Sequence, residues 1–339
     1  MSLDPNSALP VRPLGRPLRI AFLGSPGLAV HSLDALVERP DLCEVLLVAA
    51  QPDKPAGRGR RMRPPAVAQR AKELGLALSQ PAKVRSGAFP ELIESLQLDL
   101  MVVVAYGRIL TSRLLEAPAH GCINLHASLL PAYRGAGPIQ WALIRGEKET
   151  GVSTMWMEEG LDTGPILEQR ATPIAMGETA AQLGDRLAQI GAELLVSTVG
   201  SLQAGTLRAR SQPEQGVSLA PLLSHSDGHI DWSLSASSID GLVRGVTPWP
   251  GARCGYRGQE LKVLAARPAE VSSEASSEPV GAVLSVSDAG VHVRCGEGQL
   301  VLTRVQPAGR KAQDIGDFLR GYGLEVGEDL SLAKTLSEE

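Results

Sequence analysis

Four short, continuous runs of apolar residues are the feature that most limits what this chain can fold into. They lie within Leu18–Leu23, Val45–Ala50, Leu98–Ala105 and Gly121–His126, and stretches with helical spacing separate them. Strands that are apolar on both faces are typical of a parallel sheet covered by helices on each side. The first part of the chain is therefore predicted to be an α/β domain with a mostly parallel sheet.

The turn after the first run is the place where a dinucleotide-binding fold would carry its phosphate loop. Gly24-Ser25-Pro26-Gly27 lacks the G-x-G-x-x-G spacing, and Pro26 has no backbone N–H to offer a phosphate. We interpret this segment as a tight strand-to-helix turn. The sheet is predicted to be Rossmann-like without binding a dinucleotide.

The length of 339 residues favours two domains. The composition changes near residues 204–217, which have the character of a linker, and short strand-like pieces separated by turns follow. A small, OB-like β-barrel is the expected second domain. The predicted segments are a disordered lead over 1–17, the α/β domain over 18–205, a linker over 206–220, the barrel over 221–325 and a flexible loop over 270–279.

Charge and cysteine content exclude several classes of protein. With a net charge of −4, the chain is not a globally basic nucleic-acid binder, although a local basic patch is still possible. The four cysteines are far apart and form no C-x-x-C pair, so neither a zinc site nor a disulfide framework is expected, and Cys43 and Cys122 should pack as small apolar residues. The chain has neither a signal-like apolar segment nor a membrane-length apolar run, so a cytoplasmic location is expected.

Two polar residues stand at the end of the fourth apolar run. Asn124 and His126 are two positions apart, so a strand places both side chains on one face, near the end where open α/β sheets bind ligands. A loop rich in proline and glycine follows, and such loops often shape substrate pockets. Taken alone, the pair could equally be a hydrogen-bonded core histidine and a turn-capping asparagine.

A second polar segment, GLDTG at residues 160–164, follows an apparent strand over Val152–Met157. The glycines on either side of Asp162 allow close backbone approach and unusual dihedral angles. Taken alone, the segment could be a surface turn, because aspartate and glycine favour turns.

Together these segments resemble the folate-dependent formyltransferases. The resemblance is carried by Asn124, His126, SLLP at 128–131, Arg134-Gly135 and GLDTG at 160–164. Within that family, the methionyl-tRNA formyltransferases are similar in further segments: QPDKPAGRGR at 51–60, IDWS at 230–233, TPWP at 247–250 and LTRVQPAG at 302–309. The resemblance runs from Leu18 to Phe318. The chain departs from the family in its proline-rich lead, in the insertion at 270–279 and at Ala127, where many relatives carry glycine.

The resemblance implies transfer of the formyl group of 10-formyltetrahydrofolate to the α-amine of methionine on initiator tRNA, for translation initiation and without a metal. Asn124 is then expected to bind the formyl oxygen or to position the amine, and His126 to donate to the developing oxyanion. Asp162 is expected to hold His126 in its charged or correct tautomeric form, or to relay a proton through water. The folate is expected to border Ser128, Leu129, Leu130 and Pro131, and the enzyme is expected to be a monomer.

A basic loop lies between the second apolar run and the next helical stretch. It carries Lys54, Arg58, Arg60, Arg61 and Arg63 with no acidic residue among them. One interpretation of such a charged run is a solvated, mobile segment without a binding role. The resemblance implies contact with the acceptor end of tRNA through Arg58 above all, with Lys54, Arg60 and Arg61 beside it. Weaker candidates for RNA contact in the second domain are Arg244, Arg304, Arg310 and Lys311.

Three alternative functions are weighed against this one. A formyltetrahydrofolate hydrolase or a small-amine formyltransferase would share the catalytic residues, and the basic loop and second domain argue against both. A non-catalytic binding module is disfavoured because Asn124, His126 and Asp162 are all present. A zinc enzyme is disfavoured because His225 and His229 have helical ligand spacing but flank a turn, with no third ligand evident.

Overall fold

The computed structural model describes residues 15–56, 61–269, 278–332. The chain divides into two compact units, and each is described by itself. The first consists of Met1–Pro138, Glu149–Pro173 and Gly184–Pro221, and the second of Ile139–Lys148, Ile174–Leu183 and Leu222–Glu339. The predicted linker over 206–220 is therefore part of the first unit.

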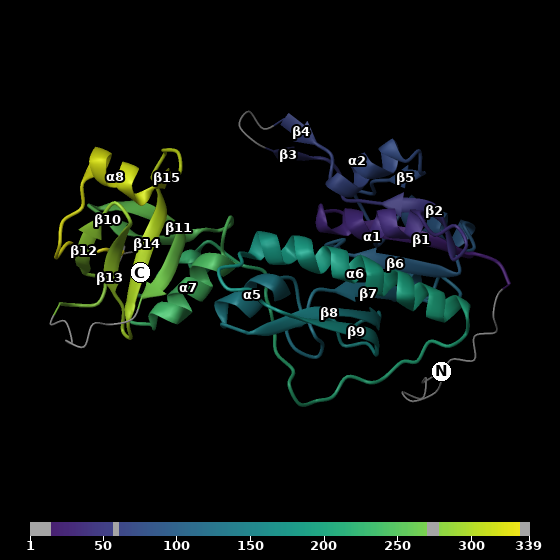
Figure 1. Ribbon diagram of the computed structural model, residues 1–339. Coiled ribbons are helices and arrows are strands. Elements are labelled where there is room, and N and C mark those ends of the chain that lie inside the picture. The colour runs from purple at the N-terminus through teal and green to yellow at the C-terminus, as the bar shows by residue number, and fades with distance from the viewer. Residues whose placement is uncertain (1–14, 57–60, 270–277, 333–339) are drawn as a thin grey trace, which may run out of the picture. The chain divides into compact units, whose positions relative to one another are not determined.

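A sheet in the order β5-β2-β1-β6-β7-β8-β9 forms the centre of the first unit (Figure 1). Its first five members are parallel: β5 (Leu78–Ser79), β2 (Cys43–Ala49), β1 (Leu18–Gly24), β6 (Leu100–Val104) and β7 (Cys122–His126). The last two, β8 (Glu149–Trp156) and β9 (Ile166–Pro173), are antiparallel. The predicted Rossmann-like, mostly parallel sheet is confirmed.

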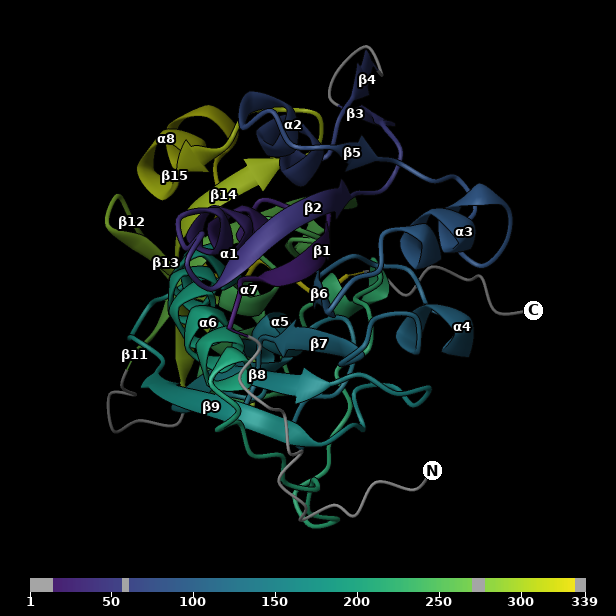
Figure 2. The same cartoon turned by 90° about the vertical axis from the view of Figure 1, so that its right-hand side faces the viewer.

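Helices cover both faces of this sheet, as its apolar strands require. Ile20 and Phe22 of β1 pack into one core and Ala21 and Leu23 into another, because successive strand side chains point to opposite faces. Figure 2 shows α3 and α4 on the opposite side of the sheet from α1 and α6. The helices of the first unit are α1 (Leu28–Val37), α2 (Ala66–Glu73), α3 (Ala88–Ser95), α4 (Ser112–Leu115) and most of α6 (Ala180–Gln203), whereas α5 (Pro138–Ile144) belongs almost entirely to the second unit.

The N-terminal lead becomes ordered sooner than predicted. Arg16 donates two hydrogen bonds to the buried carboxylate of Asp99, at 2.6 and 2.9 Å, and the backbone N–H of Arg19 donates a third at 2.7 Å. Burial by itself raises the pKa of Asp99, but the hydrogen bonds from Arg16 and Arg19 outweigh it and leave that pKa below its usual value. The prediction of disorder over 1–17 is wrong for Arg16, because a buried carboxylate needs this partner. Residues 1–14 lie outside the described part.

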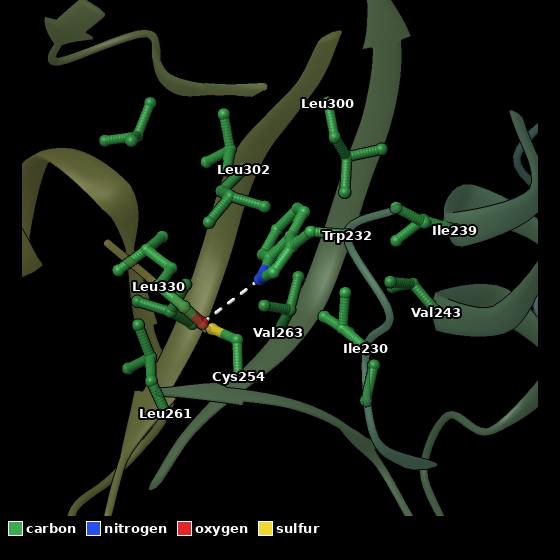
Figure 3. Close-up of a cluster of buried hydrophobic side chains, with 14 of the residues drawn as sticks. Ile230, Trp232, Ile239, Val243, Cys254, Leu261, Val263, Leu300, Leu302 and Leu330 are labelled. Carbon is green, nitrogen blue, oxygen red and sulfur yellow. Dashed lines mark hydrogen bonds between the residues drawn. The ribbon is translucent and has the colours of Figure 1, made fainter. Parts of the chain in front are cut away.

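The second unit is built on an antiparallel sheet in the order β10-β11-β14-β13-β12, with β15 paired to β14. Its core collects aliphatic side chains around Trp232, whose indole N–H donates to the Leu330 carbonyl at 3.1 Å (Figure 3). The elements are η1 (Ser226–Gly228), α7 (Ala236–Gly245), β10 (Ala252–Tyr256), β11 (Gln259–Ala269), β12 (Val283–Ser287), β13 (Gly290–Arg294), β14 (Gln299–Pro307), β15 (Gln313–Asp314) and α8 (Ile315–Tyr322).

The C-terminal tail closes this second sheet into a barrel-like unit. The backbone N–H of Gly255, in β10, donates to the Leu330 carbonyl at 2.8 Å, and the N–H of Leu330 donates to Gly281 at 2.9 Å. Next to these, the N–H of Val283 in β12 donates to Glu328 at 2.9 Å. The tail thus pairs with both edges of the sheet, and an edge that is paired no longer exposes its backbone groups.

The four cysteines are free and buried. Burial raises the pKa of the Cys43 and Cys254 thiols to about 12 and that of Cys295 to about 11. Cys43 and Cys122 pack in the two cores of the first unit, as predicted. Thiols held neutral in this way are poor nucleophiles and metal ligands.

No helix within the described ranges has the length and apolar character of a membrane span.

Candidate active site

The end of β7 supplies the first two residues of the site. Asn124 pairs with Val103 of β6 and Met155 of β8, and His126 pairs with Ser153, so both are fixed in the middle of the sheet. The strand alternation puts them on one face, as the sequence predicts. The His126 side chain is only 6% exposed, so its ring nitrogens need partners within the protein.

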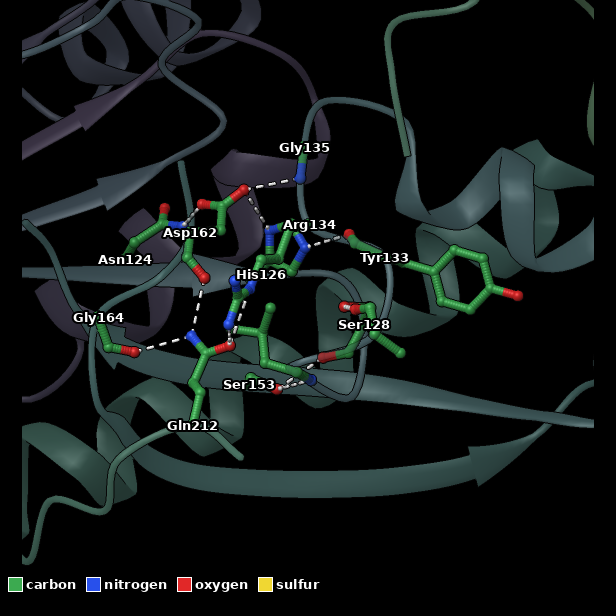
Figure 4. A network of polar contacts seen from close by, with 12 residues as sticks. Asn124, His126, Ser128, Tyr133, Arg134, Gly135, Ser153, Asp162, Gly164 and Gln212 are labelled. Carbon is green, nitrogen blue, oxygen red and sulfur yellow. Dashed lines mark hydrogen bonds and ion pairs between the residues drawn. The ribbon is translucent and has the colours of Figure 1, made fainter. Parts of the chain in front are cut away.

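Asp162 reaches the same point from the loop between β8 and β9. Its Oδ2 accepts a hydrogen bond from the backbone N–H of Gly135 at 2.8 Å and lies 3.7 Å from His126 Nδ1. Its Oδ1 lies 3.5 Å from Asn124 Nδ2 (Figure 4). The Asp162 carboxylate therefore links the two β7 residues to Gly135, in the loop that follows β7. The structure brings Asn124, His126 and Asp162 together.

The unusual backbone dihedral angle predicted for GLDTG at 160–164 occurs at the aspartate itself. Asp162 has φ +52°, a left-handed conformation that aspartate tolerates better than most residues. Close backbone approach falls on Gly164, where an added Cβ would lie 1.9 Å from the Trp156 carbonyl oxygen. Both features turn the Asp162 carboxylate inward instead of leaving it on a surface turn.

The partner of His126 Nε2 fixes the state of the ring. Nε2 lies 2.8 Å from the backbone carbonyl of Tyr133, and a carbonyl can only accept. Nε2 is therefore the protonated nitrogen. Nδ1, which faces Asp162, is the nitrogen that can gain or lose a proton.

The segment predicted to border the folate is folded back on the sheet. Ser128 and Leu130 are buried, and the Ser128 hydroxyl donates to the Ala132 carbonyl at 2.6 Å. The Ser153 hydroxyl donates to the Ser128 carbonyl at 2.6 Å and accepts from the Leu130 N–H at 3.1 Å. Leu129 and Pro131 are half-buried and have more surface to offer a ligand.

Residues 210–220, here called the strap, were predicted to be part of a linker, yet they lie along the site loops. The N–H and carbonyl of Arg210 pair with those of Ile166 at 2.9 and 2.8 Å. Further on, the N–H of Arg134 donates to Ser218 at 2.8 Å, and that of Ala220 donates to Arg134 at 2.7 Å. Gly135, with φ +121°, permits this contact, because a Cβ there would lie 2.6 Å from the Ala220 carbonyl oxygen.

The basic loop forms a small hairpin of β3 (Lys54–Ala56) and β4 (Arg61–Arg63) where a flexible segment was expected. Lys54 is directly opposite Arg63, and Arg61 is exposed. Like charges directly opposite each other destabilise a strand pair, so an anion bound here would stabilise the hairpin. The predicted contacts Arg58 and Arg60 lie outside the described residues.

An open hollow of about 450 Å³ lies after the carboxyl end of β6. Its lining includes the exposed cations Lys83, Arg85 and Arg108, a set that suits an anionic group. It was not predicted from the sequence because these residues come from two separate loops.

The histidine pair His225 and His229 was considered as a zinc site. His225 Nδ1 lies 2.7 Å from Arg253 NH2, so this nitrogen accepts from a cation and is not available to a metal. Across the described ranges no group of three or more potential metal-ligating side chains occurs.

The weaker candidates for RNA contact also lie in the second domain. Arg244 forms an ion pair with Asp240 at 2.7 Å, whereas Arg310 and Lys311 are exposed.

Comparison with known proteins defines the class of enzyme. The family model described as "Formyl transferase" matches residues 18–199, and "Formyl transferase, C-terminal domain" matches residues 222–323. The chain therefore belongs to the formyl transferases.

Named relatives define the family within the formyl transferases to which the chain belongs. The chain is 45% identical over 310 residues to methionyl-tRNA formyltransferase of Citrifermentans bemidjiense, which covers 91% of this chain and 95% of the relative. It is 46% identical over 313 residues to the enzyme of that name from Halorhodospira halophila, covering 91% and 98%. Within the formyl transferases, this chain belongs to the methionyl-tRNA formyltransferase family.

Solved structures with low sequence identity share the fold. WlaRD, a sugar 3N-formyl transferase, matches with a TM-score of 0.63 at 16% identity, over 87% of this chain and 99% of its own. HypX from Aquifex aeolicus in complex with tetrahydrofolic acid matches with a TM-score of 0.59 at 18% identity, over 90% and 48%. At sequence identities this low, the structural match establishes a shared fold only.

Proposed function

We propose that this enzyme transfers the formyl group of 10-formyltetrahydrofolate to the α-amine of methionine on initiator tRNA. Both matched family models and the names of the close relatives support this reaction. The observation that carries it is the Asp162 carboxylate placed between Asn124 and His126 at the carboxyl end of β7.

The reaction places clear demands on such a site. The amine nitrogen bonds to the formyl carbon, and the bond from that carbon to the folate nitrogen then breaks. One proton leaves the amine and one reaches the departing nitrogen. An α-amine has a pKa of about 7.7–8.0, so a large share is protonated at neutral pH and needs a proton acceptor. Between the two steps the formyl oxygen carries negative charge and needs hydrogen-bond donors.

His126 and Asp162 are suited to the proton transfers. Nε2 keeps its proton for the Tyr133 carbonyl, so the exchangeable proton sits at Nδ1, beside Asp162 Oδ2. In the protonated form Nδ1–H can be donated to the oxyanion or passed on to the departing nitrogen. Among the proton-transfer roles that the sequence left open, we assign proton donation to Nδ1 of His126.

Asn124 is suited to hold the formyl oxygen. Its amide nitrogen must face the Asp162 carboxylate, because two oxygens would repel each other. Its second N–H is then available to the developing oxyanion, and its amide oxygen to an N–H of the attacking amine. Both uses agree with the expectation from the sequence.

The donor and the RNA have candidate contacts elsewhere on the first unit. Leu129 and Pro131 offer the half-buried apolar surface on which a folate ring can pack, and Lys83, Arg85 and Arg108 offer cations to its carboxylates. The hairpin with Lys54, Arg61 and Arg63 offers cations to phosphate. We propose that Arg58 and Arg60, which lie between the two strands in the sequence, act with them.

An acceptor panel tests this function. The purified enzyme is given 10-formyltetrahydrofolate with a labelled formyl group and, separately, initiator methionyl-tRNA, elongator methionyl-tRNA, an amino-sugar nucleotide or no acceptor. We expect label on methionine of the initiator tRNA, at least tenfold faster than on any other acceptor. Formate released equally fast without an acceptor would show a hydrolase instead, and label on the amino sugar would show a small-amine formyltransferase.

A further inference from the structure

The strap places one polar side chain against the loop that carries Asp162. Gln212 Nε2 donates to the backbone carbonyl of Asp162 at 2.7 Å and to that of Gly164 at 2.8 Å. Its Oε1 accepts from Arg134 Nε at 3.1 Å and from NH2 at 2.8 Å (Figure 4). The next polar residues of the strap, Glu214 and Gln215, are exposed.

We propose that Gln212 is a positioning residue for formyl transfer, which fixes the backbone at Asp162 and so aims its carboxylate at Asn124 and His126. The inference rests on the proposed function, in which that carboxylate takes part in the reaction. Gln212 itself does not touch the reacting residues' side chains. It acts through the Asp162 and Gly164 carbonyls.

The chemistry of the contacts fixes which way the Gln212 amide points. Carbonyl oxygens only accept and a guanidinium only donates, so the nitrogen must face Asp162 and Gly164 and the oxygen must face Arg134. A flipped amide would set an oxygen against two carbonyl oxygens and an NH₂ group against a cation. Four contacts therefore hold a single orientation.

The Asp162 backbone is a place where such support is needed. Its positive φ is a conformation that costs energy for any residue with a Cβ, and such conformations persist only where surrounding contacts hold them. Hydrogen bonds on the carbonyls of residues 162 and 164 hold the loop on both sides of the turn. Without them we expect the loop to sample other conformations that turn the carboxylate away.

The strap supports the opposite side of the carboxylate as well. Asp162 Oδ2 accepts from the N–H of Gly135, and the backbone of Arg134, just before it, is paired with Ser218 and Ala220 of the strap. Arg134 also supplies the guanidinium that orients Gln212. One segment therefore fixes both the carboxylate and the N–H that it accepts from.

Substitutions at Gln212 separate this role from a general effect on folding. Gln212→Ala is expected to lower kcat about 10- to 100-fold, because misplacing a reacting group by about 1 Å can cost that much. The KM for both substrates should stay within twofold. Gln215→Ala, in the same strap but exposed, should match the unmodified enzyme.

The isosteric variant Gln212→Glu is the sharper comparison. It keeps an acceptor for Arg134 but sets a carboxylate oxygen against the Asp162 and Gly164 carbonyls. We expect a kcat at least as low as that of Gln212→Ala, because the two carbonyls repel the carboxylate and push the Asp162 loop away. Normal kcat in Gln212→Glu would show that Gln212 only anchors Arg134, and would overturn the proposal.

A double-mutant cycle with Asp162→Asn tests whether Gln212 acts through the carboxylate. Asparagine accepts the same backbone conformation but has no charge to aim. Adding Gln212→Ala to Asp162→Asn should therefore lower kcat by less than threefold, because residues that act together are not additive. The same fold-loss in both backgrounds would overturn the positioning role. If Asp162→Asn alone kept full activity, the assignment of Asp162 in the proposed function would fail instead.

Discussion

Replacing His126 with alanine is expected to lower kcat for formyl transfer about 10²- to 10³-fold, the typical loss when one donor to an oxyanion is removed. His126 is the residue in which both ring nitrogens are engaged, with Nε2 on the Tyr133 carbonyl and Nδ1 facing Asp162. Its removal deletes the exchangeable proton and the imidazole that faces the Asp162 carboxylate. The KM values should change little, because the loss falls on the transition state.

Two further variants make this result interpretable. Since His126 is buried, alanine leaves a small void, so His126→Asn provides a polar replacement of smaller volume change and should be impaired to a similar degree. His31→Ala, on the exposed face of α1, should behave like the unmodified enzyme. Transfer by well-folded His126→Ala and His126→Asn within threefold of the unmodified rate would contradict a role for the imidazole.

Neutralising the basic hairpin is expected to weaken tRNA use while leaving the chemistry intact. The double variant Lys54→Ala with Arg63→Ala, and separately Arg58→Ala, should raise the KM for initiator methionyl-tRNA about tenfold or more, since a lost charged contact is worth about 1–3 kcal/mol. The KM for 10-formyltetrahydrofolate should be unchanged. Each lost phosphate contact should also reduce the slope of log affinity against log salt by about one.

A cation elsewhere on the same unit provides the control. Lys72→Ala removes an exposed charge of α2 and should change neither the tRNA KM nor the salt slope. An equal effect of Lys72→Ala would mean that the RNA responds to net charge and not to the hairpin. Unchanged tRNA affinity in the hairpin variants would remove the hairpin from the RNA-binding surface.

Local sequence pattern was sufficient for most of the parallel strands and for placing Asn124 and His126 on one face, whereas Asp162 was grouped with them only through the family resemblance. Continuous apolar runs predicted β1, β2, β6 and β7, and the two-residue spacing placed Asn124 and His126 on one face. The antiparallel strand β9 and the long helix α6 were not predicted. In β9 the apolar pair Ile166 and Leu167 is followed at once by polar residues, so the strand lacks the continuous apolar run that marks the buried strands.

The strap shows what local pattern cannot reveal. Its serine, proline and glycine content is the same whether the chain is free or hydrogen-bonded to other loops, so composition indicated a linker. Gln212 meets the carbonyl of a residue 50 positions earlier in the chain, and no local pattern specifies such a partner. The same holds for the C-terminal tail, where Leu330 is recognisable as a core residue only once both sheet edges are seen.

The central claim is that the Asp162 carboxylate organises a site for formyl transfer to methionyl-tRNA. Its most direct test is the single-turnover rate of label transfer from 10-formyltetrahydrofolate to initiator methionyl-tRNA, in the unmodified enzyme and in Asp162→Asn. Asparagine keeps the size and the backbone preference of residue 162 but removes its charge and replaces one acceptor oxygen by an NH₂ group. We predict substrate dissociation constants within twofold and a transfer rate lower by about 10²-fold or more. Equal transfer rates in the two enzymes would contradict the account.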